Sequence, residues 1–502
     1  MKKPIQFPHT FVIIFFVVLV CAVLTYIIPM GQYDTYELTY EQNGQEKTRT
    51  VLDSDSFHLV TDENGVPQPY RVPLFGTDDE GGKIGILNYA FEGMVSGDKW
   101  SAAIGVMIFL LIVGGSFGVM FRTGAIENAI TATISHTQSK EVLIIPILFI
   151  LFSLGGAIFG MSEEAIPFVM IVVPVVIMMG YDSITGIMIT YGATQIGFAT
   201  SWMNPFSVAV AQGISGIPVM SGSGLRIFAW IFFTAFGIVF TIIYANKVKK
   251  NPTSSISYES DEYFRKNSEG KNVSDIKLGT GDYLIIAVLF ATVIWVVWGV
   301  VARGYYIPEL TSQFFVMGLV SGIIGVIFKM NDMKVNDMAT SFQKGASDLL
   351  GAALVVGMAK GILIVLGGAD PSVPSALNTV LNAAANAIGD LPPAISAWFM
   401  YIFQSIFNFF VVSGSGQAAL TMPLMAPLSD LVGVTRQVAV LAFQFGDGFS
   451  NLVVPTSGAL IGAIGAAKLD FGKWFKFSIK LQGFLFAFAS VIIVIAVLMG
   501  YQ

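Results

Sequence analysis

Four ionisable residues lie within otherwise apolar runs of the sequence: Glu163, Glu164, Lys360 and Asp447. Charged side chains in such runs are costly to bury and usually serve function. Three carboxylates against one lysine make a negative site, which favours a cationic group on a ligand, or bound H⁺ or Na⁺. Lys360 could hold a ligand carboxylate, pair with Asp447, or snorkel to the surface. Glu163 and Glu164 could instead stabilise a helix N-terminus as first-turn carboxylates.

Two turns rich in Gly and Ser interrupt apolar runs where a helix is expected to restart. The first extends from Phe159 to Pro167 and includes Ser162; the second extends from Val412 to Ala418. A restarting helix presents unpaired N–H groups with a partial positive charge, and serine can cap it. Each tip could therefore bind an anion or a carboxylate, although a plain surface loop is the alternative. The candidates at the second tip are Ser413, Gly414, Ser415, Gly416 and Gln417.

Segments 184–213 and 436–467 are too long, and too rich in Gly, Ser, Thr and Asn, for one plain helix each. Both contain Gly-Phe, then small polar residues, then Asn and Pro. Proline removes a backbone donor and clashes with the preceding turn, so the helix unwinds there. The freed carbonyls and polar side chains could bind a polar solute or a cation; a structural kink is the alternative. The candidates are Thr200, Asn204, Ser450, Asn451, Thr456 and Ser457. The pattern predicts no defined metal site, but Na⁺ could bind near Asn204 and Asn451.

The elements that must position these residues lie in lipid. The chain has 502 residues, of which 54% are hydrophobic and 12% charged, and its mean hydropathy is +0.72. Soluble proteins carry roughly 25% charged residues. Uncharged apolar runs of about 20 residues recur along the chain and indicate spanning helices. The composition therefore predicts an all-α polytopic membrane protein, with the lipid bilayer as its surroundings.

Several function classes are excluded by what the sequence lacks. One cysteine (Cys21) rules out a disulfide framework, and the three histidines, His9, His58 and His136, are scattered outside the spans. There is no phosphate-binding G-x-x-x-x-G-K-[ST] motif and no H-E-x-x-H motif. There is no basic stripe that would bind nucleic acid. We therefore expect that the protein binds no cofactor and no nucleic acid and that it is not an enzyme.

The charges in the connecting segments predict how the chain is oriented in the membrane. Segment 31–99 is acidic and is expected outside, with a β-hairpin around Asn43-Gly44. Segment 247–281 is rich in lysine and is expected to be a cytoplasmic linker. The apolar run 11–30 lacks a clear cleavage site, so we interpret it as a retained first helix rather than a signal peptide. The N-terminus is then cytoplasmic and the C-terminus extracytoplasmic. Asp182 and Asp430 are expected to be surface caps.

The order of elements repeats. Each half contains two helices, an amphipathic stretch, a two-segment hairpin, a broken helix and a final helix, and the second half starts on the opposite face. The first repeat is 1–246, with amphipathic stretch Ile126–Ser139, hairpin 142–180 and broken helix 184–213. A connecting helix, 282–302, leads to the second repeat, 303–502, with amphipathic stretch 373–388, hairpin 393–433 and broken helix 436–467.

If the two hairpins are re-entrant, the chain has about nine spans plus two hairpins; an ordinary helix bundle is the alternative. Inverted repeats with broken helices are typical of secondary transporters, with substrate at the repeat interface.

Four runs of the sequence resemble the YfcC family. They are Gly160–Ala165, Ala193–Ala199, Ser201–Pro205 and Ser413–Pro423. That family belongs with the DcuC-like C4-dicarboxylate carriers of the ion-transporter superfamily, and the resemblance covers essentially the whole chain. It implies a scaffold domain that forms a homodimer, a transport domain that holds both hairpins, and elevator-type movement.

The resemblance leaves the substrate open. One branch of relatives carries C4-dicarboxylates, and another is similar to arginine–ornithine antiporters. The tip Glu163-Glu164 matches the second branch, whereas Ser413–Gly416 departs from its more serine-rich form. Our leading hypothesis is a bacterial inner-membrane antiporter for basic amino acids, with the small-molecule solute bound at the tips and broken helices. Ser162 and Ser413–Gln417 would bind its carboxylate. The alternatives are a Na⁺- or H⁺-coupled C4-dicarboxylate carrier that uses Lys360 and, from a different class, a channel or an intramembrane enzyme.

Overall fold

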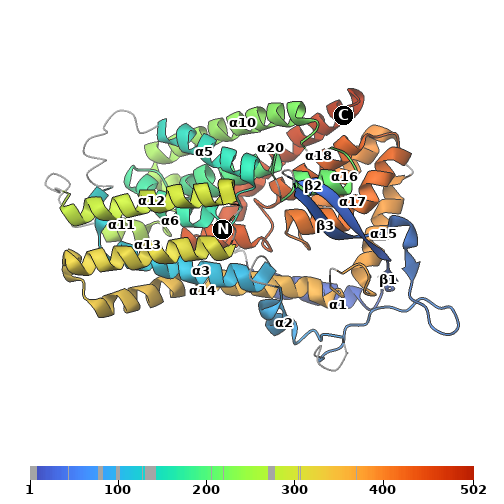
Figure 1. The fold of residues 1–502 in the computed structure, drawn as a ribbon, viewed down its shortest axis with the longest axis horizontal. Helices are drawn as coiled ribbons and strands as arrows, with labels where there is room; N and C mark the ends of the chain where they lie inside the picture. The colour runs from blue at the N-terminus through green and yellow to red at the C-terminus, as the bar shows by residue number, and fades with distance from the viewer. Residues whose placement is uncertain are drawn as a thin grey trace, which may run out of the picture.

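The computed structural model is predominantly helical, with short strands at one end (Figure 1). The residues that it describes are 8–42, 45–76, 83–97, 102–126, 128–129, 143–204, 206–218, 220–268, 278–303, 305, 307–368, 370–389 and 391–502. Most of the expected amphipathic stretch Ile126–Ser139 lies outside these residues, as do the turn Asn43-Gly44 and Pro205.

Helices long and apolar enough to cross a membrane are spread along the described parts of the chain. There are five: α3 (Ala102–Arg122), α10 (Ser223–Lys250), α13 (Ile307–Ile327), α14 (Val335–Val365) and α20 (Phe471–Leu498). Shorter apolar stretches include α1 (Thr10–Leu24), α16 (Pro393–Phe407) and the part Thr280–Val296 of α12 (Thr280–Arg303). Large apolar side chains on their outer faces, such as Phe290 and Ile294, are exposed. A face of this kind is suited to lipid, so the chain is a multi-pass membrane protein.

Helices α3, α13 and α14 lie side by side, and α2 (Tyr89–Val95) packs against α14 (Figure 1). We call these four helices the α3–α14 block. Small residues allow their close approach. A Cβ atom on Gly345 would lie 2.2 Å from the carbonyl oxygen of Gly114, and one on Gly318 would lie 2.7 Å from the Cα of Ser116. The contacts leave no room for larger residues there, so the block is tightly packed.

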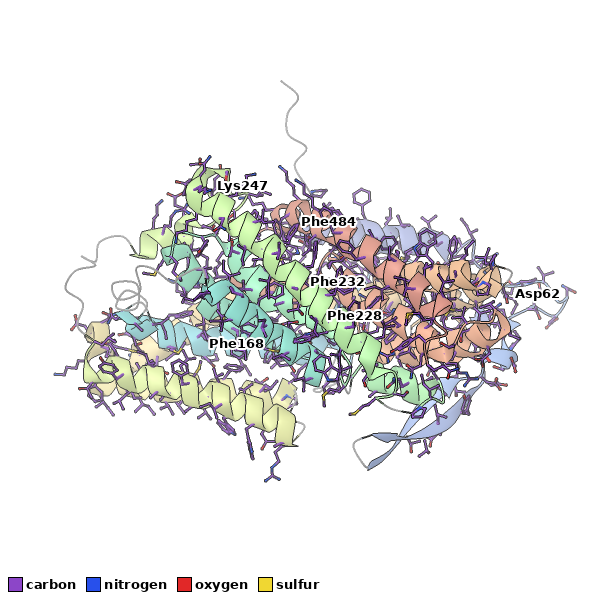
Figure 2. All side chains as sticks on the ribbon, turned by 90° about the horizontal axis from the view of Figure 1, so that it is seen from above. Asp62, Phe168, Phe228, Phe232, Lys247 and Phe484 are labelled. Carbon is purple, nitrogen blue, oxygen red and sulfur yellow. The ribbon has the colours of Figure 1, made fainter. Side chains whose placement is uncertain are left out.

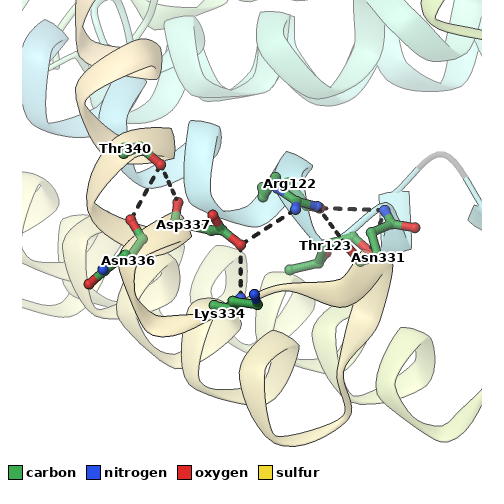
Figure 3. Close-up of polar contacts among 7 residues, drawn as sticks. All are labelled: Arg122, Thr123, Asn331, Lys334, Asn336, Asp337 and Thr340. Carbon is green, nitrogen blue, oxygen red and sulfur yellow. Dashed lines mark hydrogen bonds and ion pairs between the residues drawn. The ribbon is translucent and has the colours of Figure 1, made fainter.

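Polar contacts close the end of the α3–α14 block, where α13 turns into α14 (Figure 3). The Arg122 guanidinium lies 3.5 Å from the Asp337 carboxylate and donates to the Asn331 carbonyl oxygen at 3.0 Å. Asp337 also accepts from the backbone N–H of Lys334 at 2.9 Å, which caps the start of α14. A short 3₁₀ turn, η6 (Met330–Asp332), makes the connection.

Two helical hairpins follow the same plan. The first consists of α5 (Ile144–Phe159) and α6 (Ala165–Met178), and the second of α16 and α17 (Gly414–Leu431). Each pair is separated by a short non-helical tip, which is residues 160–164 in the first hairpin and residues 408–413 in the second. The first tip contains Gly160 and Ser162, whereas the second ends at Ser413, and the Gly and Ser residues after it form the first turn of α17.

Two interrupted helices pack against these hairpins. The first consists of α7 (Ser183–Ile187), the π-helical turn η4 (Met188–Gly192) and α8 (Ala193–Ala199), and helix resumes only at α9 (Val208–Ile214). The second is α18 (Arg436–Ser450), followed by α19 (Gly458–Ala466). Glycines bring the elements together: Gly197 meets Ser153 of α5, Gly446 meets Gln404 of α16, and Gly448 meets Ala199. The interrupted helices therefore touch each other as well as their own hairpins.

Helices α10 and α20 cover this part of the molecule and pack through aromatic rings. The rings of Phe232 and Phe488 lie 5.2 Å apart between centroids, and those of Phe240 and Phe477 lie 5.8 Å apart. Figure 2 shows α10 running along the molecule, with Phe228 and Phe232 on it, Phe484 beside it, and Lys247 near one end. Aromatic pairs of this kind add about 0.5–1.5 kcal/mol each beyond the area that they bury.

The acidic segment folds at the end of the molecule opposite Lys247, where Figure 2 places Asp62. Strands β2 (Thr35–Gln42) and β3 (Gln45–Leu52) pair antiparallel, which confirms the predicted β-hairpin. Strand β1 (Gly31–Gln32) pairs with β4 (His58–Leu59) after the turn η1 (Ser54–Ser56) and contacts α15 (Ala376–Gly389). Because β2 contacts α9 and β3 contacts α17, the hairpin lies over the second helical hairpin.

The segment after α10 is folded onto the helices, through η5 (Pro252–Ser254) and α11 (Glu262–Ser268). Asp182 caps α7, and its carboxylate also accepts from the hydroxyls of Tyr244 and Ser255, each at 2.6 Å. Asp261 accepts from Ser183 N–H at 3.2 Å and from the Ser257 hydroxyl at 2.8 Å. Asp182 is a cap, as predicted, but it is not on the surface, because this segment buries it.

Candidate functional site

The first hairpin tip depends on a glycine. Gly160 ends α5 with φ 71°, a left-handed conformation that side chains other than glycine rarely adopt. A Cβ atom at this position would lie 2.4 Å from the Asn204 side-chain oxygen. That oxygen accepts from the backbone N–H groups of Phe206 at 2.8 Å and Ser207 at 3.2 Å. The tip and the gap between α8 and α9 therefore fit against each other only with glycine at position 160.

The two glutamates of the first tip have different surroundings. The Glu164 carboxylate accepts from the backbone N–H of Ser162 at 2.8 Å and is 5% exposed. Glu163 lines a cavity described below. The Ser162 hydroxyl also lines this cavity and accepts from the Gln195 amide at 3.1 Å. Glu164 thus holds the shape of the tip, whereas Glu163 lies at the cavity wall.

The second tip begins α17 with a serine cap. The Ser413 hydroxyl accepts from the backbone N–H of Gly416 at 3.2 Å. Residues 413–416 line the cavity. Gln417 does not line it and points into the hairpin, where its amide donates to the Gln404 carbonyl oxygen at 2.9 Å. The start of α17 is therefore presented to the cavity with its N-terminal partial positive charge.

A chain of buried amides joins the first tip to the second hairpin. The Asn451 amide donates to Gln195 at 3.1 Å, and the Asn408 amide donates to the Asn451 side-chain oxygen at 2.8 Å and to the Ser450 hydroxyl at 2.7 Å. Tyr191 adds a bond from its hydroxyl to the Asn451 carbonyl oxygen at 2.9 Å. Sequence reasoning did not select Gln195, Asn408 or Tyr191 as site residues. The signal for Asn408 was an amide at the end of an apolar helix, one turn after Gln404.

The remaining predicted residues form hydrogen bonds at the ends of helices. Thr200 donates back to the Ile196 carbonyl oxygen at 2.7 Å, and Thr456 donates to the Phe409 carbonyl oxygen at 2.8 Å. Ser457 caps α19 by accepting from Leu460 N–H at 3.3 Å. Thr456 and Ser457 also face the cavity, whereas Thr200 does not.

Both hairpin tips and both interrupted helices meet at one cavity of about 430 Å³. Its size lies within the range of roughly 300–1,000 Å³ that is usual for small-molecule sites. The predicted residues that line it are Ser162, Glu163, Lys360, Ser413, Gly414, Ser415, Gly416, Asp447, Asn451, Thr456 and Ser457. The predicted residues that do not line it are Glu164, Thr200, Asn204, Gln417 and Ser450.

The cavity contains charges of both signs. Asp447 is 1% exposed, and neither of its carboxylate oxygens has a hydrogen-bond partner in the described structure. A Cβ atom on Gly414 would lie 3.1 Å from one of these oxygens, so Asp447 faces the start of α17. Lys360 lines the wall formed by α14 and makes no ion pair or hydrogen bond with any described residue. It does not snorkel away from the cavity, and it does not form an ion pair with Asp447.

Sequence comparisons identify the relatives of this chain. The family model described as "DcuC: C4-dicarboxylate anaerobic carrier" matches residues 7–498. A protein of Escherichia coli (strain K12), named "Putative basic amino acid antiporter YfcC", is 53% identical over 495 residues, which cover 99% of this chain and 97% of that protein. An "Uncharacterized protein" of Haemophilus influenzae is 28% identical over 99% of this chain and 98% of its own length.

The solved structures that this chain resembles are distant. The YdaH transporter of Alcanivorax borkumensis has a TM-score of 0.39 and 13% identity, over 98% of this chain and 99% of that one. The family match and the full-length relative establish that this chain is a transporter, and it belongs to the DcuC family as a YfcC-like protein.

Proposed function

We propose that this transporter exchanges basic amino acids across the bacterial inner membrane. The observation that supports the proposal most is the cavity with Lys360 on one wall and Glu163 and Asp447 on others. An amino acid with a cationic side chain has one carboxylate and two cationic groups. It could pair its carboxylate with the lysine and the start of α17, and its cationic groups with the two acids. The printed name of the Escherichia coli relative agrees with this choice.

The proposed division of roles is narrower than the one predicted from the sequence. Lys360, Ser413 and the backbone N–H groups of residues 414–416 would bind the carboxylate. Glu163 and Asp447 would bind the cationic groups or a coupling proton. Glu164, Gln417 and Thr200 would support the site, because the Glu164 carboxylate, the Gln417 amide nitrogen and the Thr200 hydroxyl already have partners inside the protein.

The architecture proposed for this exchange is a pair of inverted repeats, 1–246 and 303–502. The linker 247–281 and the helix 282–302 would connect them. It is supported by the matching order of hairpin, interrupted helix and long helix in the two halves. Lys247 and Asp62 lie at opposite ends of the molecule (Figure 2), which agrees with a cytoplasmic linker and an extracytoplasmic acidic segment. The N-terminus would then be cytoplasmic and the C-terminus extracytoplasmic.

Elevator-type movement is the proposed mechanism. The hairpins and interrupted helices would carry the solute past the α3–α14 block, which would also form the homodimer. The description of the matching family as a carrier favours a transporter over a channel or an intramembrane enzyme.

A Na⁺- or H⁺-coupled C4-dicarboxylate carrier is the second candidate function. It is favoured by the family description and by Lys360, whose ammonium could bind one carboxylate of a dicarboxylate. Na⁺ could then lie near Asn204 and Asn451. Under this candidate the unpaired Asp447 carboxylate would need a proton or Na⁺ beside an anionic solute.

Ligand binding to the purified protein in detergent separates the two candidates. Thermal unfolding would be followed with arginine, ornithine, succinate and a neutral amino acid, each with and without Na⁺. A ligand that binds only the native state raises the melting temperature. We expect arginine and ornithine to raise it without Na⁺. An increase with succinate alone, dependent on Na⁺, would favour the dicarboxylate carrier.

A further inference from the structure

Lys360 lies in a different part of the protein from the other charged residues of the cavity. It lies on α14, between two glycines that fix this helix against α2. A Cβ atom on Gly361 would lie 2.4 Å from the Tyr89 carbonyl oxygen, and one on Gly93 would lie 2.4 Å from the Gly357 carbonyl oxygen. The backbone of Lys360 is therefore locked into the α3–α14 block. Glu163 and Asp447 belong to a hairpin tip and an interrupted helix.

The cavity lies where these two parts meet. Beside Lys360, Val356 of α14 touches the start of α19, where a Cβ atom on Gly458 would lie 3.2 Å from the valine side chain. The cavity wall also includes Thr50 of β3 and Pro371. Thr50 belongs to the acidic segment, which is expected to be extracytoplasmic. The cavity in this conformation therefore extends toward the extracytoplasmic side.

We propose that Lys360 binds the substrate carboxylate only while the cavity is open to the extracytoplasmic side. This inference rests on the proposed function. The lysine has no counter-ion among the described residues, so an entering carboxylate would supply one. When the hairpins and interrupted helices move past α14, Lys360 stays with the α3–α14 block and loses the substrate. Substrate affinity then differs between the two faces of the membrane.

The test compares arginine exchange in right-side-out and inverted membrane vesicles. Lys360→Gln is expected to raise KM about 10- to 100-fold on the extracytoplasmic side, the usual effect of losing a hydrogen bond to a charged group. The cytoplasmic KM should stay unchanged. Lys360→Met, which keeps the length of the side chain without its charge, should behave alike, and Lys360→Arg should restore most of the affinity. Lys344→Gln is the control, because Lys344 is exposed on the same helix and does not line the cavity.

Agmatine, which is arginine without its carboxylate, identifies the group that the lysine binds. Its inhibition of arginine uptake from the extracytoplasmic side should be the same in the wild-type protein and in Lys360→Gln. An equal rise of KM on both faces, an unchanged KM, or loss of agmatine inhibition would overturn the inference while leaving arginine exchange in place. Failure of the wild-type protein to exchange arginine would overturn the proposed function, and this inference with it.

Discussion

The buried carboxylates of this protein differ in whether they accept hydrogen bonds from other groups of the protein. The carboxylate of Glu164 accepts a backbone N–H, and that of Asp182 accepts hydroxyl and N–H donors, so both are occupied. Asp447 is equally buried but has no partner in the described structure, and it faces the cavity. A buried charge without a partner is costly and is usually retained for a function. Asp447 is therefore the carboxylate whose loss should affect the ligand most directly.

Asp447→Asn should raise the KM for arginine about 10- to 100-fold, because a charge-assisted contact of roughly 1.5–3 kcal/mol is lost. The melting temperature should not fall, since the substitution removes an unpaired buried charge. Arginine exchange in proteoliposomes and thermal unfolding would be measured together. Asp430→Asn is the matched control, because Asp430 pairs with Arg436 outside the cavity. An unchanged KM in a folded Asp447→Asn protein would remove this residue from the site.

Glu164→Gln is expected to have a different effect from Asp447→Asn. The amide oxygen of glutamine can still accept from the Ser162 N–H, so the tip should keep its shape. We expect a smaller rise of KM than for Asp447→Asn, measured in the same exchange assay. A larger loss in Glu164→Gln would mean that its charge, rather than its hydrogen bond, serves the ligand.

Residue types alone indicated the site but not the direction of each side chain. The two tips and Asp447 could be selected because polar and charged residues are rare in apolar runs. Whether Glu163 or Glu164 faces the cavity depends on the turn at Gly160, and Gln417 faces inward because Gln404 lies beside it. Such contacts between distant segments leave no local pattern.

At the scale of elements, prediction succeeded where local chemistry decides the structure. The alternation around Asn43-Gly44 and the gaps in helix after Ala199 and Ser450 follow from turn residues and proline. Helix α14 begins at Val335, and because its first turns are polar, apolar composition alone does not mark its start. Helix α2 was not predicted, since its seven residues are stabilised by packing on α14.

The folded linker should respond to pH through Asp261. Burial raises the pKa of this carboxyl, and the Asp182 carboxylate adds to the rise, while hydrogen bonds from Ser183 and Ser257 oppose it. The folded pKa exceeds the unfolded one, so the contribution to docking is fully present below the unfolded pKa and is lost as pH rises through the folded pKa. The docked linker is therefore expected to be tightest in acid.

Trypsin cleavage at Arg265 and Lys266 in inverted vesicles measures linker docking. Asp261→Asn should slow cleavage relative to the wild-type protein at neutral pH, and the ratio of the two rates should approach one in acid. Glu259→Gln is the control, because Glu259 lies in the same linker and its 4.0 Å ion pair with Lys473 is weak, since the Glu259 side chain is 90% exposed. A ratio that does not change with pH would show that Asp261 does not govern docking.

The whole molecule has two parts that would have to move relative to each other in alternating access. Besides the contact of Val356 with Gly458, an ion pair joins them: the Lys468 ammonium, at the end of α19, lies 3.0 Å from the Asp348 carboxylate on α14. Ion pairs of this partly exposed kind contribute about 0–1 kcal/mol, so the pair can break without a large cost. It is expected to form in this conformation only.

Covalent linkage at the same place should stop transport. In an Asp348→Cys, Lys468→Cys double variant, a thiol-cleavable bifunctional reagent should abolish exchange, and a reducing agent should restore it. The only native cysteine, Cys21, is buried and 2% exposed, so it should not react. Either single variant treated in the same way is the control. Full exchange by completely cross-linked protein would contradict movement between the two parts.

Counterflow in proteoliposomes tests directly whether this transporter exchanges basic amino acids. Vesicles would be loaded with unlabelled ornithine or succinate, and uptake of labelled arginine and labelled succinate would be followed in parallel. We expect arginine to accumulate only with ornithine inside the vesicles and without a Na⁺ gradient, and we expect no succinate uptake. Succinate uptake driven by Na⁺ or a proton gradient, with no arginine counterflow, would contradict this expectation.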